Sequence, residues 1–160
     1  MSNSSSSDVH VPLHLRIDAT RQVLEVLRDG KISKSYPVST SKFGLGFEPG
    51  SCQTPLGRFV VSEKIGSGAP AGAVFQSRLP TGQIAPQGGQ EDLVLTRILW
   101  LAGLEEANAN TRERYIYIHG TNQEALLGTP ASHGCVRMSN ADVVECFEDI
   151  PEGTLVEIVT

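Results

Sequence analysis

The chain has 160 residues, of which 39% are hydrophobic and 19% are charged, and its formal net charge is −5. This length predicts one globular domain with one core, and the acidic balance, without any basic patch, argues against nucleic acid or an anionic membrane as a partner. Sixteen glycines and nine prolines, spread among short runs, favour strands joined by turns over a helical bundle.

The first ten residues, MSNSSSSDVH, are polar and contain too few apolar side chains to pack. We expect residues 1–10 to form a disordered tail and residues 11–160 to form the single domain. This start has neither the basic region nor the apolar run of a signal peptide, and no stretch is long and apolar enough for a membrane helix. We therefore expect a cytoplasmic protein without a membrane segment, or a periplasmic one if the natural chain begins further upstream.

The first half of the domain predicts four strands. Residues 13–18, LHLRID, alternate between apolar and polar side chains, and residues 22–41 give two more alternating runs on either side of Asp29-Gly30. Because Asp-Gly is a strong signal for a two-residue hairpin, these three runs predict an antiparallel meander. Residues 54–65, TPLGRFVVSEKI, read as a fourth strand that is followed by a loop.

The second half predicts three more strands and a helix. Residues 92–101, DLVLTRILWL, are rich in β-branched side chains and favour a strand, in which we interpret Trp100 as core and Arg97 as a surface charge. Residues 114–120, RYIYIHG, alternate so that one face enters a core and the other faces a cleft or solvent. The remaining elements are a helix capped by Ser139 or Asn140 and a last strand, in residues 139–150 and 154–160.

Three cysteines, an odd number without CxxC spacing, do not predict a disulfide framework. Cys146 shares one face of the predicted helix with apolar residues, which indicates a buried apolar side chain. Cys52 lies in a turn-rich segment, and we interpret it as an incidental thiol. Cys135 differs from both because it lies close in sequence to two histidines.

The segment IYIHGTNQEALLGTPASHGCVRM, residues 116–138, contains the residues with the most chemical potential. Gly134, directly before Cys135, would let a backbone N–H approach a reacting carbonyl, as an oxyanion hole requires. A cysteine nucleophile also needs a base or a positive neighbour, because its ordinary pKa is about 8.5. His119 and His133 are both candidates for the base, and Arg137 adds a fixed charge nearby.

Spacing alone leaves open which histidine acts with Cys135. His133 lies two residues away and on the same side if the segment is extended, whereas His119 requires the chain to return over the loop between them. No Asp or Glu occupies an obvious third position, so a backbone carbonyl is the expected partner that orients the imidazole. A zinc site made of His119, His133 and Cys135 is not favoured, since neither CxxC nor HExxH spacing is present. We expect no metal and no cofactor.

The block IHGT followed by GTPASHGCVRM resembles the signature of the L,D-transpeptidase catalytic domain, the YkuD-like family. The segment from Pro37 to Phe59 resembles the strand-and-turn lead-in of this family, and residues 16–39 resemble its first hairpin. The resemblance covers about Leu13 to Ile158 and implies a mainly β fold, a β-sandwich with one or two short helices. The interval of 12 residues between His119 and Ser132 is short for the family. This departure affects the expected shape of the lid loop and not the expected chemistry.

The resemblance also implies roles for individual residues. Cys135 matches the nucleophile, and His119 matches the general base, with its ring held by the main-chain carbonyl of Gly120. Gly134 and Cys135 would supply the oxyanion N–H groups. Ser132 and His133 match structural and substrate-side positions of the motif. Arg137 matches its final polar position, where a substrate-facing or loop-ordering role is expected. Tyr117 is expected to line the cleft, on the alternating pattern alone.

The family implies peptidoglycan stem peptides or muropeptides as partners and carbapenems as covalent inhibitors. Its members cleave the bond between a diamino acid and a terminal D-residue in a stem tetrapeptide, through a thioester on the cysteine. Water as acceptor gives an L,D-carboxypeptidase, whereas an amine of a second stem gives a 3-3 cross-link. Because the sequence shows no export signal, we expect a carboxypeptidase in murein recycling, with an L,D-transpeptidase as the alternative. A non-catalytic wall-binding module is disfavoured because the motif residues are intact.

Overall fold

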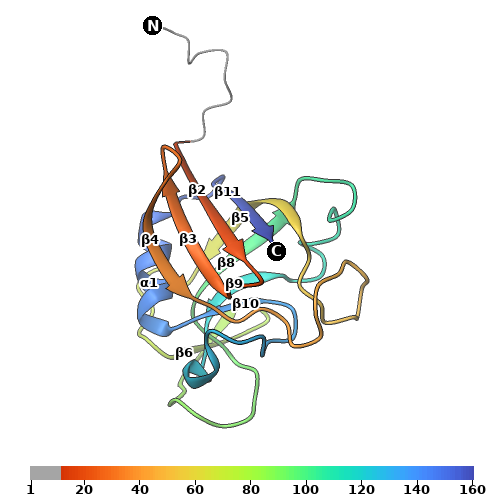
Figure 1. Cartoon of the computed structure of the whole chain (residues 1–160). Helices are drawn as coiled ribbons and strands as arrows, with labels where there is room; N and C mark the ends of the chain where they lie inside the picture. Colours follow the sequence, from red (N-terminus) through yellow and green to blue (C-terminus); the bar gives the residue numbers. More distant parts are fainter. Residues whose placement is uncertain (1–11) are drawn as a thin grey trace, which may run out of the picture.

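A computed structural model describes residues 12–160 of the chain (Figure 1). Within that range, ten strands form one mixed sheet in the order β10-β9-β8-β5-β11-β2-β3-β4, and the β6–β7 hairpin is attached to β8. The strands are β2 (Leu13–Asp18), β3 (Val23–Arg28), β4 (Lys31–Pro37), β5 (Gly57–Ile65), β6 (Ala73–Gln76), β7 (Leu79–Ile84), β8 (Val94–Gly103), β9 (Tyr117–Gly120), β10 (Val136–Met138) and β11 (Leu155–Val159). The helices are α1 (Asn140–Asp149) and the short 3-10 helix η1 (Glu124–Leu126). The prediction of a mainly β fold with one or two short helices is confirmed.

The predicted meander is present as β2, β3 and β4, which pair antiparallel in sequence order. Asp29 and Gly30 join β3 to β4 and have φ angles of 54° and 79°. A type I′ hairpin needs positive φ at both central residues, and Asp-Gly accepts this with little strain. The hairpin signal in the sequence therefore fixes the turn between β3 and β4.

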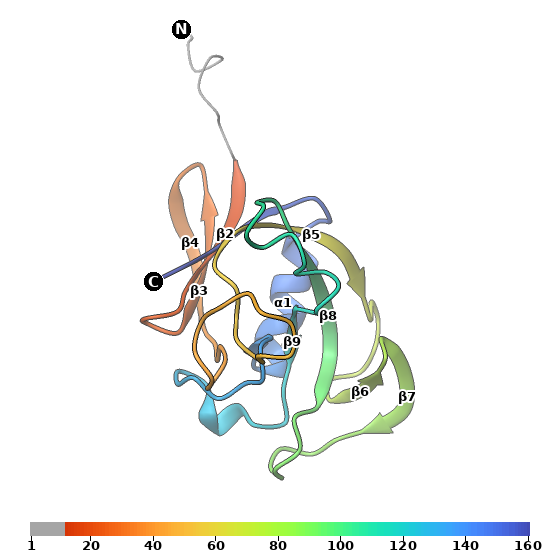
Figure 2. The same cartoon turned by 90° about the vertical axis from the view of Figure 1, so that its right-hand side faces the viewer.

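The sheet curls until its two ends meet. Ser39, just after β4, and Arg137 in β10 exchange two backbone hydrogen bonds: Ser39 N–H donates to the carbonyl of Arg137 at 3.0 Å, and Arg137 N–H donates to the carbonyl of Ser39 at 2.9 Å. Figure 2 shows the β2–β3–β4 ribbon and β8 on opposite sides of the molecule. Both flanks of β10 are therefore occupied, by β9 on one side and by Ser39 on the other.

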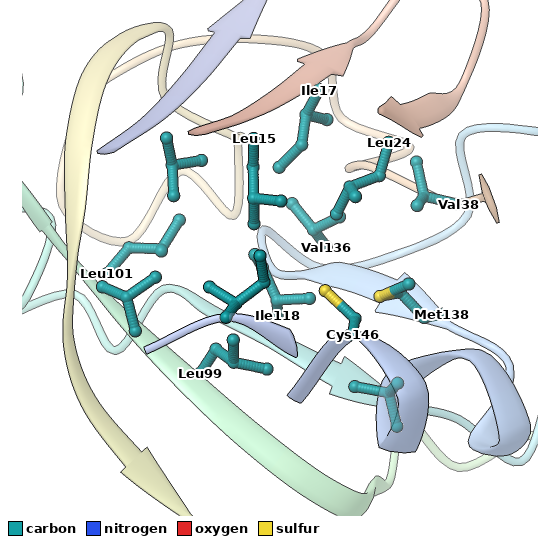
Figure 3. Packing of buried hydrophobic residues seen from close by; sticks show 14 of the residues in the cluster. Leu15, Ile17, Leu24, Val38, Leu99, Leu101, Ile118, Val136, Met138 and Cys146 are labelled. Atoms are coloured by element: carbon teal, nitrogen blue, oxygen red, sulfur yellow. The ribbon is translucent and has the colours of Figure 1, made fainter. Parts of the chain in front are cut away.

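The main apolar cluster takes side chains from both ends of the curled sheet and from α1. In Figure 3, Leu15 of β2 and Leu24 of β3 lie across from Leu99 of β8 and Ile118 of β9. Cys146 of α1 joins them and is fully buried, which confirms its interpretation as a core side chain. The helix and both parts of the sheet thus share one interior.

The helix α1 follows β10 after a single residue, and its start is capped as predicted. The Oγ of Ser139 accepts the backbone N–H of Asp142 at 3.0 Å, which satisfies one of the free donors of the first turn. The cap therefore fixes the point at which the chain leaves β10.

The predicted tail at residues 1–10 lies outside the described residues and stays a prediction. Within residues 12–160, no helix has the length and apolar character needed to cross a membrane.

Three features differ from the predictions made from the sequence. The β6–β7 hairpin and the three-residue strand β10 were not predicted, because their strands are short and β7 begins with Leu79-Pro80. The interpretation of Arg97 as a surface charge is wrong, since only 5% of this residue is exposed. Its Nη1 donates to the carbonyls of Ala69 at 2.8 Å and Thr96 at 2.7 Å, and its guanidinium lies 5.4 Å from the ring centre of Phe147.

We predict that Arg97→Ala lowers the free energy of unfolding by about 2–3 kcal/mol, because two buried carbonyls lose their donor and Phe147 loses packing. Urea denaturation measures the change. Arg28→Ala, at an exposed arginine of β3, is the control and should change the unfolding free energy by less than about 0.5 kcal/mol. Equal effects of the two substitutions would show that Arg97 has no special structural role.

Candidate active site

Cys135 lies directly before β10, and backbone groups of the segment that leads into β9 hold its side chain. The backbone N–H of Tyr117 donates to Sγ at 3.3 Å, and Sγ donates to the carbonyl of Tyr115 at 3.4 Å. The half-buried thiol also packs against the smaller apolar cluster that contains Trp100 and Tyr117. The nucleophile predicted from the sequence is therefore fixed at the junction of β10 and β9.

His119 lies in β9 and is 2% exposed. Its Nδ1 lies 2.5 Å from the carbonyl oxygen of Gly120. A carbonyl oxygen can only accept, so Nδ1 carries the hydrogen and Nε2 keeps a free lone pair. Burial lowers the pKa of His119, which keeps the ring neutral around pH 7. The ring is thus in the form that a general base requires.

Strand pairing places His119 and Cys135 on one face. In the parallel pair β9–β10, Val136 lies opposite Ile118 and Arg137 opposite His119. Side chains alternate along a strand, so those of Arg137 and His119 point to the same side as that of Cys135, which lies two residues before Arg137. The loop between the two strands therefore brings the chain back, so that His119 and Cys135 lie on the same face.

His133 points to a different partner. Its Nδ1 donates to Oδ2 of Asp92 at 2.9 Å, and its ring lies 5.7 Å from that of Phe43. The hydrogen bonds of Cys135 Sγ within residues 12–160 go to backbone groups. This geometry favours His119 over His133 as the base that acts with Cys135.

Behind the carbonyl that orients His119, the structure leaves no room for a side chain at Gly120. A Cβ there would lie 2.4 Å from Oδ1 of Asn140 and 2.8 Å from the carbonyl oxygen of Leu95. Asn140 is held in turn by Thr96, whose Oγ1 donates to Oδ1 at 2.7 Å and whose φ of 76° is rare for a β-branched residue. The irregularity of β8 between Leu95 and Ile98 therefore supports the orientation of the imidazole.

Arg137 is buried, with 1% of its side chain exposed, and it links two loops rather than facing solvent. Its Nη2 donates to Oδ1 of Asp92 at 2.7 Å, and its Nη1 donates to Oε1 of Gln123 at 2.7 Å. Of the two roles expected from the motif, this geometry supports loop ordering. Asp92 bridges Arg137 and His133 with its carboxylate. It was not predicted from the sequence, in which no acidic residue occupies an obvious third position.

The charges around Asp92 determine its protonation state. Partial burial works to raise the pKa of this carboxyl group, but the charge of Arg137 and its hydrogen bond outweigh that effect and hold the pKa below its usual range. Asp92 therefore stays ionised and compensates the buried guanidinium.

The turn that precedes Cys135 is closed by Ser132. Its Oγ donates to the carbonyl of Cys135 at 2.6 Å and accepts the N–H of Gly134 at 3.2 Å. Gly134 has a φ of 125°, which a side chain would disfavour, and its carbonyl accepts from Oγ1 of Thr54 at 2.9 Å. The loop of Cys52 thus borders the turn. Because the Gly134 N–H is used within the turn, the backbone N–H of Cys135 is the better candidate of the two predicted oxyanion donors.

Tyr117 is buried beside the thiol, where its ring meets that of Trp100 edge-on at 5.7 Å and its hydroxyl accepts from Arg78 at 3.2 Å. An open cleft of about 830 Å³ lies beyond this region, between the β6–β7 hairpin and residues 85–94, and includes Asp92 in its lining. Within residues 12–160, no group of three His, Cys, Asp or Glu side chains is arranged to hold a metal ion.

The chain matches the family model of the L,D-transpeptidase catalytic domain, YkuD, over residues 12–158. The chain belongs to this family. It is 26% identical over 149 residues to YkuD of Bacillus subtilis (strain 168), covering 92% of this chain and 66% of the relative, and 33% identical over 136 residues to YqjB of the same organism, covering 84% and 64%. The chain thus spans somewhat less than two thirds of the length of these L,D-transpeptidase relatives.

Solved structures of L,D-transpeptidases share the fold. The structure of LdtMt1 in complex with imipenem matches with a TM-score of 0.59 and 20% identity, covering 92% of this chain and 59% of that one. The likeness confirms the fold that the resemblance implied. The roles of individual site residues rest on the geometry described above.

Burial raises the pKa of the Cys135 thiol to about 12, although Arg137 and Arg114 favour the thiolate. We predict that alkylation of Cys135 by iodoacetamide accelerates about tenfold per pH unit from about pH 7 to pH 10 without a plateau near the ordinary cysteine pKa. Mass spectrometry of the Cys135 peptide measures the rate. His119→Gln should leave the profile unchanged, whereas a plateau below about pH 8 that disappears in this variant would reveal a preformed thiolate–imidazolium pair.

Proposed function

We propose that the chain is a cysteine acyltransferase that cleaves the bond between the diamino acid and the terminal D-residue of peptidoglycan stem tetrapeptides. The observation that supports this proposal is the common face of β9 and β10, toward which the side chains of Cys135 and a neutral His119 both point. Membership of the L,D-transpeptidase catalytic domain family supplies the substrate class.

The first half of the reaction follows from the protonation states. The raised pKa of Cys135 and the lowered pKa of His119 give a neutral thiol and a neutral base at rest. As Sγ attacks the carbonyl carbon, its proton passes to Nε2 of His119, and the developing oxyanion accepts from the backbone N–H of Cys135. The C–N bond then breaks, His119 protonates the leaving amine, and a thioester remains on Cys135.

The acceptor in the second half defines the product. Water deprotonated by His119 releases a tripeptide, whereas an amine from a second stem forms a 3-3 cross-link. We favour water and therefore an L,D-carboxypeptidase that acts in murein recycling. The net charge of −5 supports this choice, because an acidic protein gains no electrostatic attraction to polyanionic wall material. A cytoplasmic location, which we also propose, would supply such muropeptides.

Carbapenems should acylate the same thiol. The imipenem complex of LdtMt1 shows that a protein with this fold binds such a compound. The half-buried Cys135 is the thiol we assign to this reaction, because Cys146 is fully buried in the core.

The decisive experiment incubates the protein with a disaccharide tetrapeptide, first alone and then with a second stem as amine acceptor, and determines product masses. We expect tripeptide and free D-Ala in both cases. A cross-linked dimer in the second case would establish the transpeptidase alternative instead. If neither D-Ala nor an adduct with a carbapenem forms, the proposed function is wrong.

Variants test the assignment of the base. We predict that Cys135→Ala abolishes D-Ala release and the carbapenem adduct, and that His119→Ala lowers the rate about 10²- to 10⁴-fold, because the proton then has no positioned acceptor. Cys52→Ala is the control and should retain activity. A severe loss in His133→Ala combined with near-normal activity in His119→Ala would reverse the assignment.

A further inference from the structure

The turn of the β6–β7 hairpin has an unusual composition for its geometry. Ser77 and Arg78 are its two central residues, and both have positive φ angles, 49° and 67°. A two-residue turn of this kind is normally built from Asn and Gly, because a Cβ at positive φ is disfavoured. Backbone strain of this sort persists where the surrounding contacts hold it and often marks a functional position.

The contacts that hold Arg78 are aromatic. Its guanidinium carbon lies 5.0 Å from the ring centre of Trp100 and 4.9 Å from that of Tyr115, and its Nη1 donates to the hydroxyl of Tyr117 at 3.2 Å. Aromatic faces attract a guanidinium and fix its plane without using its N–H groups. Most of the five donors of Arg78 therefore stay available for a ligand.

A second arginine on the same indole shows the contrast. Arg112 lies 3.7 Å from the ring centre of Trp100, but its Nη2 pairs with Oε1 of Glu63 at 3.0 Å. Within residues 12–160, no carboxylate forms an ion pair with Arg78. Of these two arginines, Arg78 is thus the one without a direct ion pair, and Glu63 acts on it only through its charge.

Two tyrosines connect this charge to the nucleophile. Tyr115 and Tyr117, which contact the guanidinium of Arg78, are the residues whose backbone holds Sγ of Cys135. In a stem that ends one residue after the scissile bond, the terminal carboxylate follows the attacked amide by a single residue, a span of about 3.8 Å between successive Cα atoms. If the substrate runs from the thiol along the side chains of Tyr115 and Tyr117, its terminal carboxylate lies on the side of the thiol that Arg78 occupies.

We propose that Arg78 binds the α-carboxylate of the terminal D-residue, so that the enzyme selects stems that end directly after the scissile bond. This inference rests on the proposed function. A guanidinium held in one plane matches a carboxylate with two parallel hydrogen bonds, which a neutral amide or a peptide bond at the same position cannot accept equally well. The acceptor amine does not suit the guanidinium of Arg78, because both groups are hydrogen-bond donors and the guanidinium is already positively charged.

The test compares two donors, a stem tetrapeptide ending in D-Ala and the same peptide with its terminal carboxylate amidated. Release of D-Ala or D-alaninamide gives kcat/KM for the wild type, Arg78→Gln, Arg78→Lys and Arg112→Gln. We expect the wild type to prefer the free acid by about 10- to 100-fold, the range for hydrogen bonds to a charged group. Arg78→Gln should lose this preference by lowering the rate for the acid alone, and Arg78→Lys should restore part of it.

Arg112→Gln, which removes the other cation on Trp100, should keep the preference. The inference is overturned if the wild type does not distinguish acid from amide, or if Arg78→Gln lowers both rates equally, as a purely structural role would. If the wild type releases neither product and forms no carbapenem adduct, the proposed function fails and the inference falls with it. A wild type that is active, combined with an undiminished preference in Arg78→Gln, refutes the role of Arg78 alone.

Discussion

The parallel pairing of β9 with β10 is the constraint on which the site depends. These strands have only four and three residues, yet their register places His119 opposite Arg137 and brings Cys135 beside Tyr117. Such a short strand would pair weakly if it had one neighbour, but β10 also bonds to Ser39 on its other flank. The meander at the start of the chain therefore contributes to the geometry of a site to which it supplies no reacting group.

Burial sets the chemistry of the site as much as position does. A buried ionisable group must be neutral or paired with an opposite charge. His119 is neutral and bonded to a carbonyl, whereas Arg137, opposite it in the next strand, is charged and paired with Asp92. The thiol of Cys135 is neutral, like His119. In the proposed mechanism, this uncharged pair becomes charged only during attack and gains from fixed dipoles nearby, because those dipoles do not have to reorganise as charge develops.

Local signals in the sequence predicted most of the fold, and longer-range features were missed. The Asp29-Gly30 turn and the Ser139 cap act over a few residues, so their strands and helix could be predicted. The partner of His133 could not, because Asp92 is distant in sequence and meets it only through the loops. The burial of Arg97 likewise depends on the carbonyl of Ala69, which no pattern around Arg97 indicates. The motif supplied the assignment of Cys135 and His119 only through resemblance, since spacing alone left the base open.

The β6–β7 hairpin is attached to the sheet by two residue pairs, Val74 with Leu95 and Phe75 with Val94, and the residues of β7 are exposed. A unit with so few cross-strand bonds opens at a smaller free-energy cost than the strands that hold Cys135 and His119. Changes in the length or composition of the exposed strand β7 would therefore leave the folding of the strands that carry Cys135 and His119 largely intact. Under the proposed roles, the hairpin that carries Arg78 is a separate unit from the strands that carry Cys135 and His119, which gives one catalytic framework a route to several substrate preferences.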